Sequence, residues 1–86
     1  MPEEQGQRVV LVDDDGVSLA MLARGLRKRG YVVAAYSDPR EMLLKLRDDA
    51  PAAVITDMRM PHLSGLDVVE RVHTTLGGDA PAVIVV

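Results

Sequence analysis

The chain has 86 residues with 10 basic and 13 acidic side chains, so its formal net charge is −3. This length suits a single domain, and the absence of cysteine excludes a disulfide framework or a thiolate metal site. The acidic balance argues against direct binding of nucleic acid. The hydrophobic fraction of 48% is high for so short a chain and is typical of a sheet that helices cover on both faces.

The first seven residues are polar and acidic, unlike the basic and then apolar start of a secretory signal. We predict a flexible N-terminal lead at residues 1–7 and one domain at residues 8–86. The longest apolar stretch, residues 80–86, is far too short to cross a bilayer. These features favour a cytoplasmic protein that has no contact with a membrane.

Four short apolar runs are predicted to be strands. Runs of this length that are bounded by polar residues are typical of strands buried inside a parallel sheet. The connections between them are too long for hairpins, which predicts parallel strands joined by right-handed crossovers. The runs lie at residues 8–12, 31–36, 52–56 and 82–86.

The first predicted helix follows Asp15, whose side chain suits the N-cap, and it ends at Gly30, which suits the position after the C-cap. The basic residues between positions 24 and 29 are expected on its solvated face and in its last turn, where positive charges interact favourably with the helix dipole. Its buried stripe is predicted from the apolar residues at helical spacing, Leu19, Leu22, Ala23 and Leu26.

The second predicted helix begins after Asp38, with Pro39 at its first position and Glu41 three residues after the cap. Its inner face is predicted to carry Leu43, Leu46 and Ala50. The third predicted helix follows a loop at residues 58–65. Its inner side is predicted to carry Leu66, Val69, Val72 and Leu76.

Aspartates follow the first and the third apolar run. Asp13, Asp14 and Asp15 come after the first, and Asp57 comes directly after the third. Ligand sites of open parallel sheets lie at the carboxyl ends of the strands, so these carboxylates are expected to share one crevice if the two strands are neighbours. Such a cluster suits a hard divalent cation, and Mg²⁺ suits it best because it binds one or two carboxylates and phosphate oxygens.

The two histidines, His62 and His73, are not placed to add nitrogen ligands, which disfavours zinc. They are interpreted as a loop residue and a solvated helix residue. A carboxylate beside Mg²⁺ can itself act as a nucleophile and form an acyl phosphate. Asp57 is the better candidate because it stands alone at the end of a central strand. The alternative, that the aspartates only cap a helix and form a turn, is disfavoured by their position at two strand ends.

The segments VVLVDDD and VITDMRMPHLSGLDVVERV resemble the receiver domain of the response regulators of two-component signalling. The pattern D-x-x-M-P-x-x-x-G is met by Asp57, Met60, Pro61 and Gly65, and the paired acids of the family by Asp13 and Asp14. The resemblance covers residues 8–86. It implies a flavodoxin-like α/β fold, with a parallel sheet of strand order 2-1-3-4 and helices on both faces.

The resemblance also implies the chemistry. Asp57 would be the phosphoacceptor, and a sensor histidine kinase or a phosphotransfer protein would be the phosphodonor. Mg²⁺ would be held by Asp14, Asp57 and the main-chain carbonyl of Arg59, and by Asp13 through water. The domain would not be an enzyme beyond self-catalysed phosphoryl transfer and autodephosphorylation, and Arg59 would influence how fast the acyl phosphate hydrolyses.

The family pattern continues past residue 86 with a fifth strand and two helices, so the resemblance predicts a receiver truncated after its fourth strand. Residues 82–86 would then form an exposed edge strand without charge or proline, which predicts a homo-oligomer or a strand-exchanged dimer. Two other functions stay open. One is an interaction module that no longer switches. The other is a Mg²⁺-dependent phosphohydrolase, although that class usually has a second aspartate where Arg59 stands.

Overall fold

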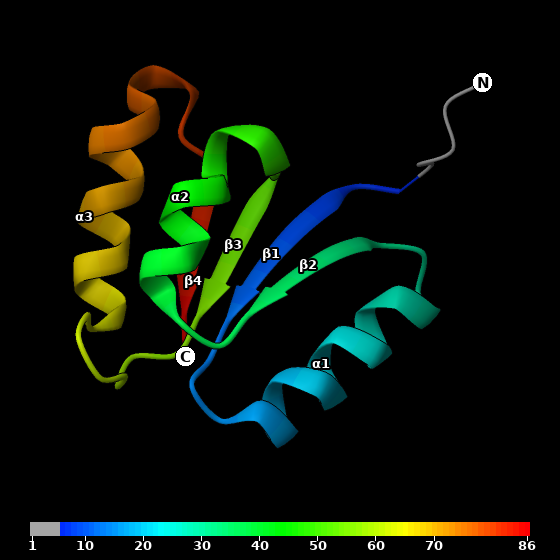
Figure 1. Ribbon diagram of the computed structural model, residues 1–86. Coiled ribbons are helices and arrows are strands. Elements are labelled where there is room, and N and C mark those ends of the chain that lie inside the picture. Colours follow the sequence, from blue (N-terminus) through cyan, green and yellow to red (C-terminus); the bar gives the residue numbers. More distant parts are fainter. Residues whose placement is uncertain (1–5) are drawn as a thin grey trace.

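The four predicted strands form one parallel sheet of order β2-β1-β3-β4 in the computed structural model, which describes residues 6–86 (Figure 1). The predicted strand order is therefore confirmed, and each strand lies within one residue of its predicted bounds. The strands are β1 (Arg8–Val12), β2 (Val32–Tyr36), β3 (Ala53–Thr56) and β4 (Ala82–Val85).

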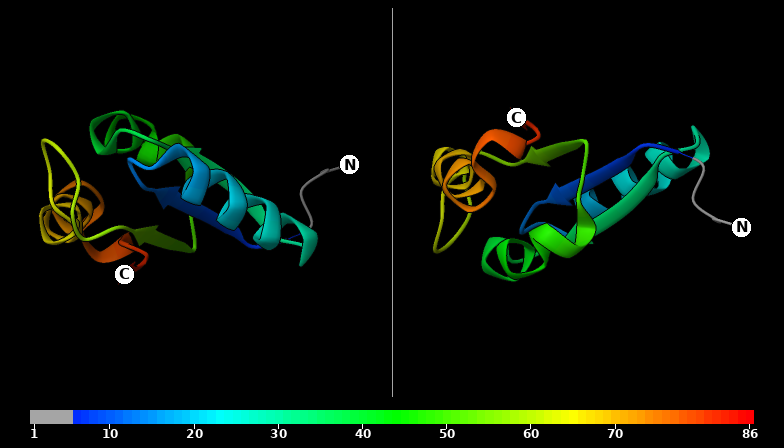
Figure 2. Two further views of the ribbon diagram at one scale, coloured as in Figure 1. Left: turned by 90° about the horizontal axis from the view of Figure 1, so that it is seen from below. Right: turned by 90° about the horizontal axis from the view of Figure 1, so that it is seen from above.

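Helices lie on both faces of this sheet (Figure 2). The helix α1 (Gly16–Lys28) packs over β1 and β2 on one face, while α2 (Pro39–Asp49) and α3 (Gly65–Leu76) pack on the other. A short 3₁₀ turn, η1 (Gly77–Asp79), leads from α3 to β4. All four strands point the same way, so their carboxyl ends meet along one edge of the sheet.

The alternation of side chains along β1 divides the core into two parts. Val10 and Val12 face α2 and α3, and they are almost fully buried. Val9 and Leu11 face α1, where they pack with Ala23. Successive residues of a strand point to opposite faces, so a continuous apolar run is what a central strand covered on both faces requires.

The predicted helix ends agree with the structure. Asp15 is the N-cap of α1, where its side chain accepts a hydrogen bond from the Val17 N–H, and Gly30 follows the C-cap with φ of 96°. Asp38 is the N-cap of α2, and the side chain that binds it is that of Arg40 rather than Glu41.

The predicted inner faces of α2 and α3 are wrong in part. Leu66 is 63% exposed, because the buried stripe of α3 runs through Val68 and Val72, one turn apart. The fully buried residues on the inner face of α2 are Met42 and Leu46. Ala50 does not belong to this face, because it lies past the last turn in a left-handed conformation and is exposed. The stripe of α1 holds at Leu19, Ala23 and Leu26, whereas Leu22 is 44% exposed.

Most of the predicted N-terminal lead lies outside the described residues, which begin at Gly6. The main-chain carbonyl of Gln7 accepts a hydrogen bond from the Val32 N–H at 2.9 Å, so the pairing of β1 with β2 extends to the residue before β1. Within residues 6–86, no helix combines the length and apolar character that crossing a membrane requires.

Candidate functional site

The carboxyl ends of β1 and β3 lie side by side, because Val12 pairs with Thr56 in the sheet register. Each of the two strands is followed by an aspartate whose main-chain N–H still bonds to the neighbouring strand. The Asp57 N–H donates to the Val12 carbonyl at 3.0 Å, and the Asp13 N–H donates to the Tyr36 carbonyl at 3.1 Å. The predicted convergence of the two strand ends is thus present.

Three carboxylates meet at this edge. One carboxylate oxygen from each of Asp13, Asp14 and Asp57 lies within 4.8 Å of the other two. Asp13 and Asp57 are half-buried and Asp14 is exposed. Like charges at this separation repel one another, so the arrangement is unfavourable unless a cation or protons offset it. It is the feature of the structure that points most directly to a ligand.

Asp15 has a separate role, as expected for a helix cap. Its side chain accepts hydrogen bonds from the Val17 N–H at 3.1 Å and from the Ser18 hydroxyl at 2.9 Å. The hydrogen bond from Ser18, followed by that from Val17, lowers the pKa of Asp15. Asp13 also contributes locally, since it accepts a hydrogen bond from the Asp15 N–H at 2.9 Å. The turn after β1 therefore fixes one carboxylate of the cluster.

The loop after Asp57 is held close to the sheet. The Met58 N–H donates to the Val86 carbonyl at 3.0 Å, and the Gly65 N–H donates to the Met58 carbonyl at 2.7 Å. The hydroxyl of Thr56, which is fully buried, donates to the Asp57 carbonyl at 3.0 Å. These bonds fix the backbone on both sides of the Asp57 side chain.

Gly65 is required by this close approach. A Cβ atom at position 65 would lie 2.8 Å from the carbonyl oxygen of Asp57 and 2.9 Å from both Met58 Cα and Val85 Cγ1. Two of these atoms belong to the backbone, which cannot yield as a flexible side chain does. The fixed glycine of the D-x-x-M-P-x-x-x-G pattern thus has a steric cause at this site.

A cavity of about 270 Å³ lies beside one carboxylate of the cluster, that of Asp14, and the sequence did not predict it. It is lined by Asp14 and by residues of the two neighbouring loops, Ser37, Asp38, Pro39, Pro61 and His62. The Arg40 side chain donates hydrogen bonds to Asp38, which together with other contacts lower the pKa of Asp38 to about 2, and the charge of His62 contributes in the same direction. His62 and His73 are both exposed, as predicted.

The donor atoms of the carboxylate cluster fit Mg²⁺. They are all oxygens, they come from three aspartates within 4.8 Å, and Mg²⁺ prefers such ligands while it keeps waters and phosphate oxygens in its remaining positions. Asp13, Asp14 and Asp57 are the side chains that would hold the ion. The contribution of the Arg59 carbonyl stays a prediction.

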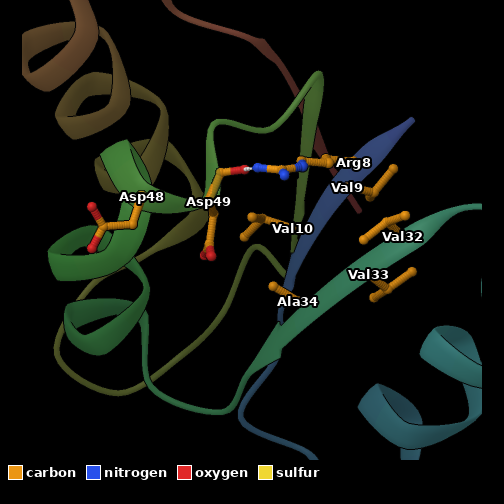
Figure 3. A pocket seen from close by; sticks show the side chains of 8 residues that line it. All are labelled: Arg8, Val9, Val10, Val32, Val33, Ala34, Asp48 and Asp49. Atoms are coloured by element: carbon orange, nitrogen blue, oxygen red, sulfur yellow. Dashed lines mark hydrogen bonds between the residues drawn. The ribbon is translucent and has the colours of Figure 1, made fainter. Parts of the chain in front are cut away.

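A second cavity, of about 340 Å³, lies far from this site, near the amino ends of β1 and β2 (Figure 3). Arg8 crosses it and donates a hydrogen bond to the main-chain carbonyl of Asp49 at 3.1 Å. The Asp49 carboxylate in turn accepts the hydroxyl of Tyr36. The other residues that line this second cavity are mostly valines, which offer no chemistry. We therefore place the candidate site at the carboxylate cluster and the smaller cavity beside Asp14.

Known proteins resemble this chain in sequence. Residues 9–86 match the response regulator receiver domain family. The response regulator MprA of Mycolicibacterium vanbaalenii is 39% identical over 77 residues, which cover 90% of this chain and 33% of MprA. The transcriptional regulatory protein PrrA of Mycobacterium tuberculosis has the same identity and coverage. The chain spans about a third of the length of these curated relatives.

Solved structures resemble it in fold. The chemotaxis protein CheY4 of Vibrio cholerae superposes with a TM-score of 0.87 at 26% identity, over 94% of this chain and 68% of CheY4. The receiver domain of the sensor histidine kinase PA1611 of Pseudomonas aeruginosa, solved with a magnesium ion in its active site cleft, gives 0.83 at 25% identity over 94% of this chain and 66% of that one. From its sequence, sheet order and strand-end carboxylates, the chain belongs to the response regulator receiver domain family.

Proposed function

We propose that Asp57 is the phosphoacceptor of this receiver domain and takes a phosphoryl group from a sensor histidine kinase or a phosphotransfer protein. The observation that carries the proposal is the meeting of the Asp13, Asp14 and Asp57 carboxylates within 4.8 Å at the ends of β1 and β3. Asp57 is the reacting group because the loop bonds on both of its sides hold it in one position, whereas Asp13 takes part in the turn before α1.

The transfer needs a positioned nucleophile and compensation of charge. A carboxylate oxygen of Asp57 attacks phosphorus, the bond from phosphorus to the donor breaks, and its electron pair leaves with the donor. The product is an acyl phosphate on Asp57, which water hydrolyses. When Mg²⁺ is bound, its charge offsets that of the phosphoryl oxygens. Asp13 and Asp14 serve to hold the ion beside Asp57, and both transfer and hydrolysis are self-catalysed.

The proposal extends to the setting of the domain. The names of MprA and PrrA support a role within a response regulator, and the magnesium ion in the PA1611 receiver supports Mg²⁺ at the carboxylates. We place the domain at residues 8–86, one residue more than the family match. A cytoplasmic location is part of the proposal, because a histidine kinase draws its phosphoryl group from ATP.

Labelling with acetyl phosphate and Mg²⁺ tests this function. The intact mass is expected to rise by one phosphoryl group, and chelation of Mg²⁺ is expected to prevent the rise. An interaction module that has lost the chemistry would stay unlabelled. A phosphohydrolase would instead turn over a small phosphomonoester, and such turnover would contradict the proposal.

Binding of Mg²⁺ is expected to depend on Asp14 and not on Asp15. Asp14→Ala removes a carboxylate of the cluster, so the dissociation constant for Mg²⁺ is expected to rise by about tenfold or more, since even the partners of metal ligands have effects of that size. Asp15→Ala is the matched control, because Asp15 caps α1. Calorimetric titration of both variants measures this, and a larger loss for Asp15→Ala would refute the assignment.

We also propose that the 86-residue chain associates through β4. Ile84 is 49% exposed and Val86 is 70% exposed, and the free edge of β4 carries no charged side chain. The opposite edge differs, because Arg27 donates a hydrogen bond to the outer strand at the Val33 carbonyl, at 2.8 Å. An apolar, unprotected edge favours pairing with another strand.

Sedimentation at high micromolar concentration is expected to detect a dimer or a larger species. Ile84→Lys places a charge on β4 and is expected to shift the population toward monomer. Leu44→Lys is the matched control, because Leu44 is 83% exposed on α2, away from β4. A monodisperse monomer of the unaltered chain would contradict the proposal.

A further inference from the structure

The face of the sheet that carries α1 is only half covered. Among the described residues, α1 is the helix on this face, and it packs on β1 and β2, while β3 and β4 lie beyond it (Figure 1). Leu11 of β1 faces α1, and the sheet register pairs it with Ile55, which pairs in turn with Ile84. Paired residues of neighbouring strands point to the same face. This face of the sheet therefore continues past α1 over Ile55 and Ile84.

The uncovered part of this face is apolar. Ile84 is 49% exposed and Val86 is 70% exposed. The Val86 N–H still donates to the Thr56 carbonyl at 3.0 Å, so the alternation of side chains places Val86 on the same face as Ile84. Contiguous apolar patches are typical of interaction sites. We call this surface the open half-face, and it consists of Ala53, Ile55, Ala82, Ile84 and Val86.

The outer side of α1 carries a second exposed apolar surface. Val17 and Met21 lie one turn apart and are each 70% exposed. The same line along the helix continues through Arg24 and Lys28, so it is apolar in its first half and basic in its second. A helix that packs only on its own sheet needs one apolar side. α1 has two, which indicates that its outer side also has a partner.

One flank of α1 faces the open half-face. The other flank faces the outer edge of the sheet, because Arg27 donates a hydrogen bond to the Val33 carbonyl of β2. Leu22 lies about 140° from Arg27 around the helix, with the buried Ala23 between them. Leu22 is 44% exposed, and a Cβ atom at Gly25 on the same flank would meet no atom within 4 Å. Within residues 6–86, no element fills the space between this flank and the open half-face.

We propose that a second copy of this chain fills this space, and that the outer side of each α1 covers the open half-face of the other copy. A two-fold axis parallel to the strands produces this contact, with the two α1 helices side by side between the two sheets and Leu22 next to its counterpart. α1 begins at the carboxyl end of β1, so Val17 and Met21 lie at that edge of the sheet. Ile84 and Val86 lie at the same edge, and the two apolar surfaces therefore meet.

The charges and the symmetry fit the same arrangement. Lys28, at the other end of α1, comes near the amino end of β4 in the second copy, which follows the exposed acidic residue Asp79. A two-fold axis across the strands would instead place α1 over α1 and leave the open half-faces apart. The contact leaves the outer edge of β4 free, so it is separate from pairing through that edge. It does not depend on the chemistry of Asp57, and it places the carboxylate clusters of both copies at the same end of the dimer.

Cysteine cross-linking tests the contact, because the chain contains no cysteine of its own. Leu22→Cys is expected to give a disulfide-linked dimer under mild oxidation, since the axis places the two positions next to each other and a disulfide needs Cα atoms within about 7 Å. A mixture of Met21→Cys and Ile84→Cys is expected to give a mixed dimer. Leu44→Cys is the matched control and is expected to stay monomeric on a non-reducing gel, because Leu44 is 83% exposed on α2, on the other face of the sheet.

Sedimentation measures the strength of the contact. Met21→Glu places a charge in the covered surface without disturbing the monomer, because Met21 is exposed and glutamate favours a helix. The dissociation constant of the dimer is expected to rise by about tenfold or more, because burying an unpaired charge is unfavourable. Leu44→Glu is the control and is expected to change nothing.

Absence of both cross-links, or an unchanged dissociation constant in Met21→Glu, would overturn this inference. If Met21→Glu associates as the unaltered chain does and Ile84→Lys does not, the β4 edge alone carries the association. An unaltered chain that stays monomeric would contradict both contacts. Labelling of Asp57 by acetyl phosphate is measured separately and decides only the proposed acceptor function. Circular dichroism of each variant checks that the fold is retained.

Discussion

Asp57→Asn is expected to reduce labelling by acetyl phosphate to background while the fold stays intact. The amide has the shape of the carboxylate but is not a nucleophile at phosphorus. The change also removes one of three mutually repelling charges, so the melting temperature is expected to stay the same or to rise. Intact mass and circular dichroism measure the two effects.

Asp15→Asn is the control for this experiment. It makes the same chemical change at an aspartate that caps α1, and asparagine caps a helix as well as aspartate does. Labelling of this variant is expected to equal that of the unaltered chain. Undiminished labelling of Asp57→Asn would show that another group accepts the phosphoryl group and would remove the basis of the proposed function.

Gly65→Ala is expected to lower the free energy of unfolding by about 1–3 kcal/mol, the usual cost of forcing extra atoms into a well-packed site. The added methyl group would meet the Asp57 carbonyl oxygen at 2.8 Å and Met58 Cα at 2.9 Å. The loop must shift to relieve these contacts, and it carries Asp57 with it. Labelling is therefore expected to slow as well.

Gly25→Ala gives the opposite expectation in the same chain. Position 25 lies inside α1, and a Cβ there meets no atom within 4 Å. Replacing a glycine inside a helix by alanine stabilises by about 0.5–1 kcal/mol. Urea denaturation of both variants measures the contrast. A Gly65→Ala variant as stable as the unaltered chain would show that the loop yields easily and does not fix Asp57.

Local signals made much of the fold predictable. Asp15, Asp38 and Gly30 mark helix ends through bonds and conformations within a few residues, and the structure has all three in these roles. The strands β1 and β3 were predictable because central strands covered on both faces need unbroken apolar runs. The meeting of the Asp13, Asp14 and Asp57 carboxylates was predictable from their places at two strand ends and from the parallel order of the strands.

The unpredicted features depend on tertiary contacts. The inner face of α3 is set by which of its residues meet the core, and these are Val68 and Val72 rather than Leu66. The residue type alone does not predict the positive φ of His62, since such values are uncommon for every residue other than glycine, although histidine is among the types in which they are enriched. The cavity at His62 needs loops from β1, β2 and β3 at once. Similarly, the D-x-x-M-P-x-x-x-G pattern contains Gly65, but only the structure shows why a glycine is needed there, which is the close approach to the Asp57 backbone.

The pairing of β1 with two partners has a consequence for the order of folding. β1 meets β2 after the short excursion of α1, but it meets β3 only when a stretch on the order of 40 residues has closed, which costs more chain entropy. A partly folded chain with β1, α1 and β2 alone holds Asp13 and Asp14 without Asp57 beside them. If Asp57 is the acceptor, as proposed, phosphorylation requires the assembled sheet, and an incompletely folded chain stays unlabelled.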